Sequence, residues 1–413
     1  VYRAPTGLKD RVIVADTDKQ LFIDDFVIDK MSGLKRRLHA FKKHKRNPVF
    51  QAQVPWEEGW ADPFMSTVIY DEEQRCFRMW YRCGPRHSLK GYAVSEDGVH
   101  WRRPNIAAAP WHEFQNHNLL GFDGQIGIWK KPGNNVQYNP HAEDPEDRFL
   151  SLFYQHEKTY GVSRSIDGIT WSQPQVMRPA YGDVVSLITD PGQDRYLFFP
   201  KYMREHDGFV RRSFAAATLQ KLNDPFTARF PFLAGHREDA LVGDGACRAF
   251  GSLLPDVTQL NQFHSEIYSV TAIPYEGVFV ALYDLWSVIG NREGPLDMPM
   301  KVSRDMKTWT DVDFPRRALS IGRFGEWDSG MVYGANTMLV VDDEIRLYYL
   351  GANMGHCTRV LPMTRAYHTL GVGLATLRLD GFASLQASGE LAGTVTTRPL
   401  QVQGNDLIVN ADC

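Results

Sequence analysis

The stretch SEDGVHW at residues 95–101 returns as SIDGITW at 165–171, and a looser copy, SRDMKTW, occupies 303–309. Its Ser and Asp side chains suit hydrogen bonds to the backbone of a turn, Gly suits the left-handed conformation, and Trp fills the space beneath. A single Asp-Gly turn is weak evidence, because such turns are common in β-hairpins. Three copies of one pattern indicate an internal structural repeat.

The spacing of the copies predicts how many units the chain holds. Trp101 and Trp171 are 70 residues apart, and Trp309 lies 138 residues, or twice 69, after Trp171. An additional unit, whose turn has lost the repeated sequence pattern, is therefore expected between the second and third copies. A further 70 residues lead into another Asp-Gly turn that ends in an aromatic residue, at 380–382. The spacing thus predicts five units.

Each unit carries short runs rich in β-branched and aromatic residues, bounded by Gly, Pro and Asp, which predict β-strands. These runs are 66–70, 76–81 and 91–94; 126–129, 149–154 and 160–162; 184–188, 196–199 and 213–217; 267–270, 278–283 and 300–302; and 337–341, 345–350 and 371–376. Hardly any stretch has the pattern of a long amphipathic helix. Five antiparallel sheets in series close most simply into a ring. We therefore expect an all-β chain, folded as a five-bladed β-propeller with antiparallel four-stranded blades.

The composition is that of an ordinary globular protein, with 413 residues, 43% of them hydrophobic and 23% charged. The formal net charge of -3 predicts no general attraction to nucleic acid. No apolar run reaches the length of a membrane span, so we expect no membrane partner. The five cysteines are scattered and form no CxxC pair. This spacing indicates neither a disulfide framework nor a zinc site.

We expect residues 45–385 to form the propeller as the catalytic domain, with residues 1–44 bracing it. Residues 386–413 form a strand-like tail. The stretch 35–46 carries seven Lys and Arg residues. Because the whole chain is slightly acidic, we interpret this stretch as a solvated loop rather than a phosphate-binding stripe.

A carboxylate stands just before the first strand of every unit. The first strand of each propeller blade lines the axis, so these side chains should converge on one mouth. Crowded carboxylates raise one another's pKa values, which costs stability unless a reaction or a metal uses them. Hydrolysis of a glycosidic bond needs two carboxyl groups. The candidate catalytic residues are Asp62, Asp123, Asp183 and Glu266, and the fifth unit contributes Glu326 and Asp328.

Side chains near these carboxylates suit sugar binding. Aromatic rings can pack on sugar faces, while His, Arg and Lys can bind hydroxyls or anionic groups. The candidate substrate-binding residues are Trp60, Arg82, His156, Lys201, His264, Glu326, Asp328 and His356. We expect no required cofactor. Clustered carboxylates at the axis would also suit Ca²⁺, but no motif demands a metal.

Further motifs accompany the repeated turns: LFIDD at 21–25, NPV at 47–49, PWE at 55–57 and GLATLRLDGF at 373–382. With them the chain resembles the five-bladed β-propeller glycoside hydrolases, the broad group of invertases and other β-fructosidases, arabinanases and β-xylosidases. It looks in particular like an uncharacterised bacterial branch often labelled invertase-like. The resemblance spans essentially the whole chain.

The resemblance implies roles for the carboxylates. Asp62, in WADP, would be the nucleophile or base, and Asp123 would orient it or tune the acid. In the family the general acid is usually a Glu of the third blade, and this chain departs from that pattern. We favour Glu266 of unit four as the acid, with Asp183 as the alternative. Relatives continue into a C-terminal β-sandwich, and the tail at 386–413 resembles its start.

We therefore expect a hydrolase that cleaves a glycosidic bond at the mouth, exo-acting on a plant or algal oligosaccharide or polysaccharide. One alternative is a glycoside phosphorylase, with Lys201, Arg204 and Arg248 as candidate phosphate ligands. Another is a non-catalytic carbohydrate-binding propeller. The chain opens at Val1 with no visible signal peptide, and the expected function favours a secreted or periplasmic location. The oligomeric state is left open.

Overall fold

A computed structural model describes residues 2–3, 12–15, 19–84, 88–122, 125–126, 135–155, 158–206, 209–233, 264–288, 294–356, 368–389, 392–402 and 408–411. Across these ranges the regular structure is β-strand, apart from the short 3₁₀ turns η1 (Pro55–Glu57), η3 (Pro145–Asp147) and η4 (Pro191–Gln193). The expected all-β class is therefore confirmed. In the same ranges, no helix has the length and apolar character needed to cross a membrane.

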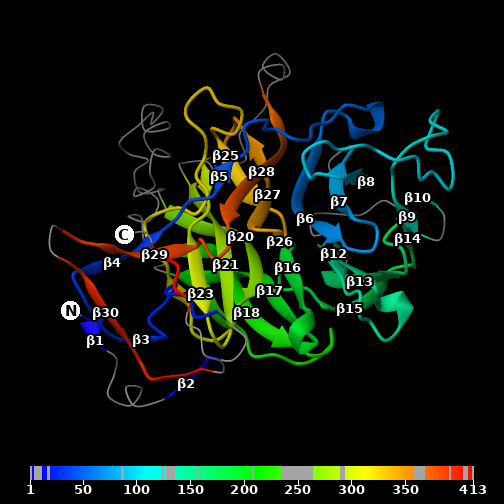
Figure 1. Cartoon of the computed structure of the whole chain (residues 1–413). Helices are drawn as coiled ribbons and strands as arrows, with labels where there is room; N and C mark the ends of the chain where they lie inside the picture. Colours follow the sequence, from blue (N-terminus) through cyan, green and yellow to red (C-terminus); the bar gives the residue numbers. More distant parts are fainter. Residues whose placement is uncertain are drawn as a thin grey trace.

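Groups of antiparallel strands follow one another along the chain (Figure 1). The first group is β6 (Ala61–Asp71), β7 (Cys76–Cys83) and β8 (Leu89–Ser95), and the second is β11 (Asn135–Tyr138), β12 (Phe149–Gln155), β13 (Thr159–Ser165) and β15 (Gln175–Pro179). The third is β16 (Val185–Asp190), β17 (Arg195–His206), β18 (Phe209–Leu219) and β19 (Arg229–Leu233).

The fourth group is β20 (His264–Tyr275), β21 (Val278–Val288), β23 (Met300–Ser303) and β24 (Thr310–Asp311). The fifth is β25 (Met331–Gly334), β26 (Leu339–Val341), β27 (Glu344–Ala352) and β28 (Leu370–Arg378), with β5 (Lys42–Lys43) at its edge. A short strand, β22 (Leu296–Asp297), pairs with both β21 and β25 and so joins these two groups. The small strands β9 (Gly121–Phe122), β10 (Gln125–Ile126) and β14 (Thr170–Trp171) form a separate sheet.

The first strand of the second group is β11, which the sequence analysis did not predict. Of the run predicted at 126–129, Ile126 is in β10, and residues 127–129 lie outside the described residues. The sequence of β11 is polar, but Asn135 and Gln137 are buried, at 0% and 5% exposure. Asn135 Nδ2 donates to the Val185 carbonyl at 2.6 Å, and Gln137 Oε1 accepts from the Thr189 backbone N–H at 2.7 Å. These bonds to β16 satisfy the side-chain amide nitrogen of Asn135 and the side-chain oxygen of Gln137, which would otherwise be costly to bury. A strand of this kind escapes a search for apolar runs.

The first strands of the five groups touch one another in cyclic order. Contacts join β6 to β11, β11 to β16, β16 to β20, β20 to β25, and β25 back to β6. Among the described strands, the hydrogen-bonded sheets of the five groups are joined only through β22. The innermost strands of neighbouring groups therefore face each other, and the first and fifth groups are neighbours in space.

The repeated turns share one hydrogen-bonding scheme. Asp97 Oδ1 accepts bonds from the backbone N–H groups two and three residues ahead, at 2.8 Å each. Asp167 and Asp305 make the same two bonds at 2.7 to 2.8 Å. The residue after each Asp has a positive φ, between 59° and 77°, which favours Gly and is adopted by Met306 in the third copy. The predicted turn structure is confirmed.

These turns also fasten one strand group to the next. Trp80 Nε1 of β7 donates to the Gly168 carbonyl at 2.7 Å, so the turn of the second group rests on the first. Likewise, the Tyr348 hydroxyl of β27 donates to the Gly98 carbonyl at 2.9 Å. The turn of the first group therefore rests on the fifth, in agreement with the contacts of the inner strands.

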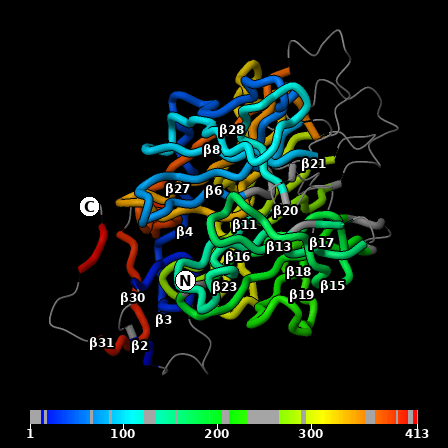
Figure 2. The backbone as a smooth tube through the Cα atoms, turned by 90° about the vertical axis from the view of Figure 1, so that its right-hand side faces the viewer, coloured from blue at the N-terminus to red at the C-terminus, as the bar shows by residue number. Residues whose placement is uncertain are grey.

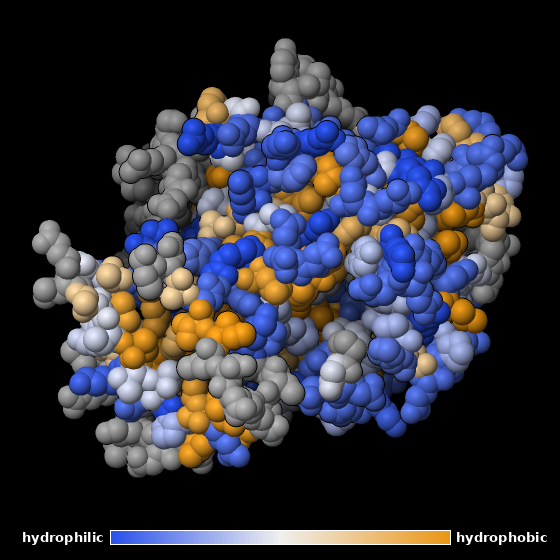
Figure 3. All heavy atoms as spheres, viewed as in Figure 1, coloured by the Kyte–Doolittle hydropathy of each residue, from blue (hydrophilic) through white to orange (hydrophobic). Residues whose placement is uncertain are grey.

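The two ends of the chain pair with each other (Figures 1 and 2). Their strands are β1 (Tyr2–Arg3), β2 (Ile13–Ala15), β3 (Ile28–Ser32), β4 (Leu34–Leu38), β29 (Ala383–Ala387), β30 (Thr394–Thr397) and β31 (Leu400–Val402). Here β3 pairs with β1 and β30, β4 with β29, and β2 with β31. Figure 3 shows hydrophobic residues gathered over these strands at the lower left.

The interpretation of residues 35–46 as a solvated loop is wrong. This stretch contains β4 and β5, and β5 pairs with β28 of the fifth group. Lys43 of β5 donates to Asp328 Oδ2 at 2.6 Å, and Asp328 is 1% exposed. A buried carboxylate requires such a partner, so Lys43, whose side chain is 27% exposed, binds an interior group of the fold.

Candidate functional site

Two ion pairs lie next to each other where the third and fourth strand groups meet. In the first, Lys201 of β17 donates a hydrogen bond to Asp183, which precedes β16. In the second, Arg212 of β18 donates to Glu266 of β20. The charges of Arg212 and Glu266 both act on the pKa of Lys201, so the two pairs are close to each other. We call these four side chains the ion-pair cluster.

The long hairpin of β17 and β18 brings the two cations together. Its strands continue past the start of β16, and Met203 pairs with Arg212 across the hairpin. Because alternate residues of a strand point to one face, Lys201 and Met203 share a face, and Arg212 shares it with them. The hairpin packs against β20, which carries Glu266. The register of one hairpin therefore places both cations beside carboxylates.

Burial and charge act in opposite directions on the Asp183–Lys201 pair. Burial lowers the pKa of Lys201, and this effect exceeds the opposing attraction of Asp183. Burial by itself would raise the pKa of Asp183, but the Lys201 ammonium and the hydrogen bond from it hold that pKa below its ordinary value. The Asp183 side chain is 41% exposed, against 8% for Lys201. Asp183 is thus an ionised carboxylate that solvent reaches.

His356 lies beside the ion-pair cluster. Its ring packs edge-on against Tyr268, with centroids 4.3 Å apart, and against Trp286, at 4.7 Å. The Tyr333 hydroxyl is 2.5 Å from His356 Nδ1. Burial, and after it the positive charge of Arg212, lowers the pKa of His356 to about 3. The imidazole is therefore neutral near pH 7, and one ring nitrogen is held by a tyrosine.

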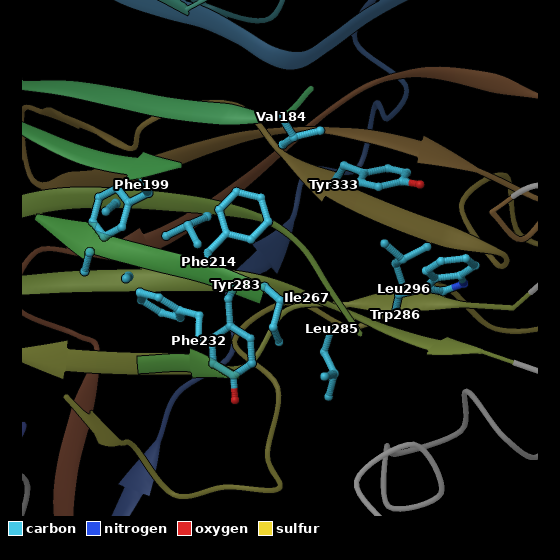
Figure 4. Packing of buried hydrophobic residues seen from close by; sticks show 14 of the residues in the cluster. Val184, Phe199, Phe214, Phe232, Ile267, Tyr283, Leu285, Trp286, Leu296 and Tyr333 are labelled. Carbon is cyan, nitrogen blue, oxygen red and sulfur yellow. The ribbon is translucent and has the colours of Figure 1, made fainter. Parts of the chain in front are cut away.

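The hydrophobic core packs against the residues of this site. Figure 4 shows buried residues of the third, fourth and fifth groups, with Phe199 and Phe232 at one end and Trp286 and Tyr333 at the other. Trp286 is 0% exposed and Tyr333 4%. Both rings are locked by packing, so the groups that contact His356 are rigid.

Asp62 is held in a buried ion pair. It faces Arg82 across β6 and β7, and Arg82 Nη2 donates to both carboxylate oxygens at 2.9 Å. The Trp60 indole N–H also donates to Asp62. Asp62 is 0% exposed and Arg82 is 6% exposed. Three predicted site residues, Asp62, Arg82 and Trp60, therefore contact one another, and the Asp62 carboxylate is not accessible to solvent.

The two predicted carboxylates of the fifth group, Glu326 and Asp328, accept hydrogen bonds from neighbouring protein groups. Asp328 accepts hydrogen bonds from Lys43 and from the Tyr349 hydroxyl, the latter at 2.9 Å. Glu326 is exposed and accepts from the Arg323 backbone N–H at 2.7 Å, within its own loop. Their partners in the described part of the chain are thus structural.

Four predicted residues have no described side chain. Asp123, His156 and Arg248 lie outside the described residues, and so does the side chain of His264, whose backbone begins β20. Within the described ranges, no group of three or more His, Cys, Asp or Glu side chains could hold a metal ion. We assign no step to a metal, and the expectation about Ca²⁺ stays a prediction.

Comparison with solved structures shows which known folds this chain resembles. The structure is similar to that of an N-acetylgalactosamine deacetylase from F. plautii in complex with blood group B trisaccharide, at 12% identity and a TM-score of 0.50, covering 84% of this chain and 96% of that one. This likeness shows the fold alone. No protein-family model and no curated protein matches the chain.

Two further solved structures are similar at lower TM-scores. One is a putative glycoside hydrolase from Parabacteroides distasonis, with 14% identity, a TM-score of 0.47, and coverage of 82% of this chain and 97% of that one. The other is an endo-arabinase from Bacteroides thetaiotaomicron, with 10% identity, a TM-score of 0.45, and coverage of 76% and 94%. Because one fold hosts many reactions, the reaction has to be argued from the site.

The site contains residues that the sequence analysis missed, namely Arg212, Tyr268 and Tyr333. All three lie within strands, where no motif marks them. One signal was present for Arg212, since it precedes the apolar run SFAAA at 213–217. An arginine at the edge of a buried strand needs an acidic partner, and Glu266 is that partner.

A further missed residue, Asp284 of β21, is a fully buried carboxyl group. It is 0% exposed, accepts from the Gly334 backbone N–H at 3.3 Å, and is hydrogen-bonded to Ser269. Burial raises the pKa of Asp284 from 3.8 to about 8, and the charge of Asp297 acts in the same direction. Asp284 is therefore largely protonated at neutral pH in the folded protein.

Asp284→Asn is expected to stabilise the protein above about pH 4. The raised pKa means that the contribution of Asp284 to stability is fully present below its unfolded-state pKa. It is then lost by about 1.4 kcal/mol per pH unit as the pH rises toward the folded value. The amide keeps both hydrogen bonds but cannot ionise. Tm measured for both proteins at pH 5, 7 and 9 should show a gap that widens with pH, and a constant gap would contradict the assignment.

Proposed function

We propose that this chain is a carbohydrate-active enzyme that hydrolyses a glycosidic bond at the mouth of a five-bladed β-propeller. The observation that carries the proposal is the ion-pair cluster, in which Asp183 and Glu266 share one site with His356. Support for five blades comes from the cyclic contacts of the inner strands and from the turn of the first group resting on the fifth.

The two carboxylates differ in a way that suits two roles. Asp183 is exposed and ionised, as a base or nucleophile requires. The Glu266 side chain is 9% exposed and bound by Arg212. A neighbouring guanidinium favours the carboxylate form. Glu266 can therefore act as the general acid only if the leaving-group oxygen of the sugar displaces Arg212 from its carboxyl group, and we propose that substrate binding does this.

Asp62 takes a supporting role in this proposal. The resemblance implies that it is the nucleophile or base, but its burial against Arg82 leaves no oxygen open to a sugar. We propose that the Asp62–Arg82 pair holds the start of β6 in place. Asp123, which lies outside the described residues, stays a candidate for a further carboxyl group at the mouth.

A specific observation also favours a second function, glycoside phosphorolysis. Lys201 and Arg212 lie beside the carboxylates on one face of a hairpin. Two cations beside a carboxylic acid could bind inorganic phosphate, which would then act as the nucleophile. In that reaction one carboxyl group protonates the leaving oxygen, and phosphate replaces the second carboxylate.

A product assay separates these functions. The protein is incubated with a panel of oligosaccharides and polysaccharides, with and without phosphate, and released sugars, sugar phosphates and acetate are quantified. Sugar release that is independent of phosphate is the expected result. Release only with phosphate would establish the phosphorylase, and acetate alone would indicate deacetylation. Binding to a panel member without any product would replace the enzyme proposal by a carbohydrate-binding propeller.

A further inference from the structure

A second surface lies on the opposite face of the hairpin that carries the ion-pair cluster. It consists of Tyr181, which precedes β16, Tyr202 and Arg204 of β17, and Phe230 of β19. We call these four side chains the aromatic platform. Because residues alternate along a strand, Tyr202 and Arg204 point away from the face of Lys201.

The rings of the aromatic platform are fixed by one another. Tyr181 and Tyr202 stack with centroids 4.7 Å apart and planes inclined by 20°. Phe230 meets Tyr202 edge-on at 5.0 Å. Phe226 packs edge-on against Tyr181 at 5.6 Å, on the side of the core. Even so, Tyr181 is 40% exposed, so a large rigid ring is left in contact with solvent.

Arg204 adds an accessible positive charge to the aromatic platform. Its guanidinium lies 4.0 Å from the centre of the Phe230 ring, and the residue is exposed. Among the described side chains, no carboxylate is within ion-pair distance of Arg204, whereas Lys201 and Arg212 each have one. A stacked guanidinium keeps its edge free for a bidentate bond to a carboxylate.

A tightly packed segment connects the aromatic platform to the proposed active site. Tyr181, Gly182 and Asp183 are consecutive, as are Lys201 and Tyr202. A Cβ on Gly182 would come within 2.8 Å of the Lys201 carbonyl, so the two backbones are in contact. The Gly182 carbonyl also accepts a hydrogen bond from Tyr160 at 3.1 Å. Asp183 and Tyr181 are two residues apart on this segment and contact opposite faces of the hairpin, so a glycan that passes round the segment can contact both.

We propose that the aromatic platform binds a uronic acid residue of an acidic glycan, so that the substrate of the proposed active site is an anionic oligosaccharide rather than a neutral one. The apolar face of the sugar packs on Tyr181, and its carboxylate binds Arg204. This inference rests on the proposed function for the position of the cleaved bond, but the binding itself does not require cleavage. It assigns no chemical step to the aromatic platform.

The test is a binding measurement by calorimetry on the full chain. An oligogalacturonate, a neutral oligosaccharide of the same length and a sulfated oligosaccharide are titrated into the wild-type protein and into Glu266→Gln, which limits turnover. The expected result is binding of the oligogalacturonate that weakens with salt and falls about tenfold or more in Arg204→Gln and in Tyr181→Ala. Preference for the sulfated chain would overturn the uronate assignment.

Matched substitutions elsewhere control for general surface effects. Phe324 is 90% exposed and follows the exposed Arg323, so Phe324→Ala and Arg323→Gln remove an aromatic ring and a charge without touching the aromatic platform. Both should bind like the wild type. The inference would be overturned if the neutral oligosaccharide bound as tightly as the oligogalacturonate, or if the oligogalacturonate did not bind. It would also be overturned if the control variants lost as much affinity as Arg204→Gln and Tyr181→Ala. If the oligogalacturonate bound but was not cleaved, the proposed uronate site would stand and the proposed hydrolase activity would be rejected.

Discussion

Replacing Glu266 with Gln is expected to lower the rate of glycoside cleavage by about 10²- to 10⁴-fold, the usual effect of losing a general acid or base. The amide can still accept a hydrogen bond from Arg212, so the folded structure should survive. Turnover is measured on the best substrate of the glycan panel, together with Tm. We expect a lower Tm, because Arg212 loses its charged partner, and a KM close to that of the wild type, because the loss of activity falls on the chemical step.

Glu344 of β27 offers a matched control for this substitution. It is also a glutamate paired with an arginine, Arg346 at 3.5 Å, but its side chain is 46% exposed. Glu344→Gln should leave turnover and Tm unchanged. Near-normal turnover in Glu266→Gln would remove Glu266 from the mechanism and leave Asp183 as the remaining carboxylate of the cluster to be tested in the same way.

Arg82→Met is expected to destabilise the protein by about 3–5 kcal/mol, the cost of leaving one member of a buried ion pair without its partner. The substitution keeps an unbranched apolar stem but leaves the Asp62 carboxylate without its bidentate donor. Adding Asp62→Asn to Arg82→Met should restore most of the lost stability. The measurement is the free energy of unfolding from denaturant titrations of the single and double variants.

The exposed pair between Arg148 and Glu73 serves as the reference. Glu73 is 66% exposed, so Arg148→Met should cost about 1 kcal/mol or less. The same variants decide between two roles for Asp62. If Asp62→Asn kept full stability and abolished cleavage, the nucleophile role implied by the family resemblance would be correct and our supporting role wrong.

The turns show which features could be predicted from the sequence. Asp97 and Asp167 bind backbone groups only two and three residues ahead, so every partner lies within the same short motif. The spacing between these motifs then predicted the order of the strand groups. Where a strand is polar, as β11 is, its burial depends on bonds to a distant strand, and no apolar run in the sequence predicted it.

The candidate site shows the opposite case. Asp183, Lys201, Glu266 and His356 were all predicted as site residues, but nothing in the sequence indicated how they would pair. Glu266 binds Arg212, which lies 54 residues away on another strand, and Arg212 carries no motif. Asp62 and Asp328 follow the same sequence pattern as Asp183, yet both are buried against cations.

The sequence by itself determined the all-β class, the repeated turns and the set of carboxylates near the starts of the inner strands, because these depend on local hydrogen bonds and on strand-length apolar runs. Only the tertiary structure decided which carboxylates reach solvent and which cation each one meets. Exposure and ion pairing depend on strand register and on packing between segments far apart in the chain, and a local pattern carries no information about either.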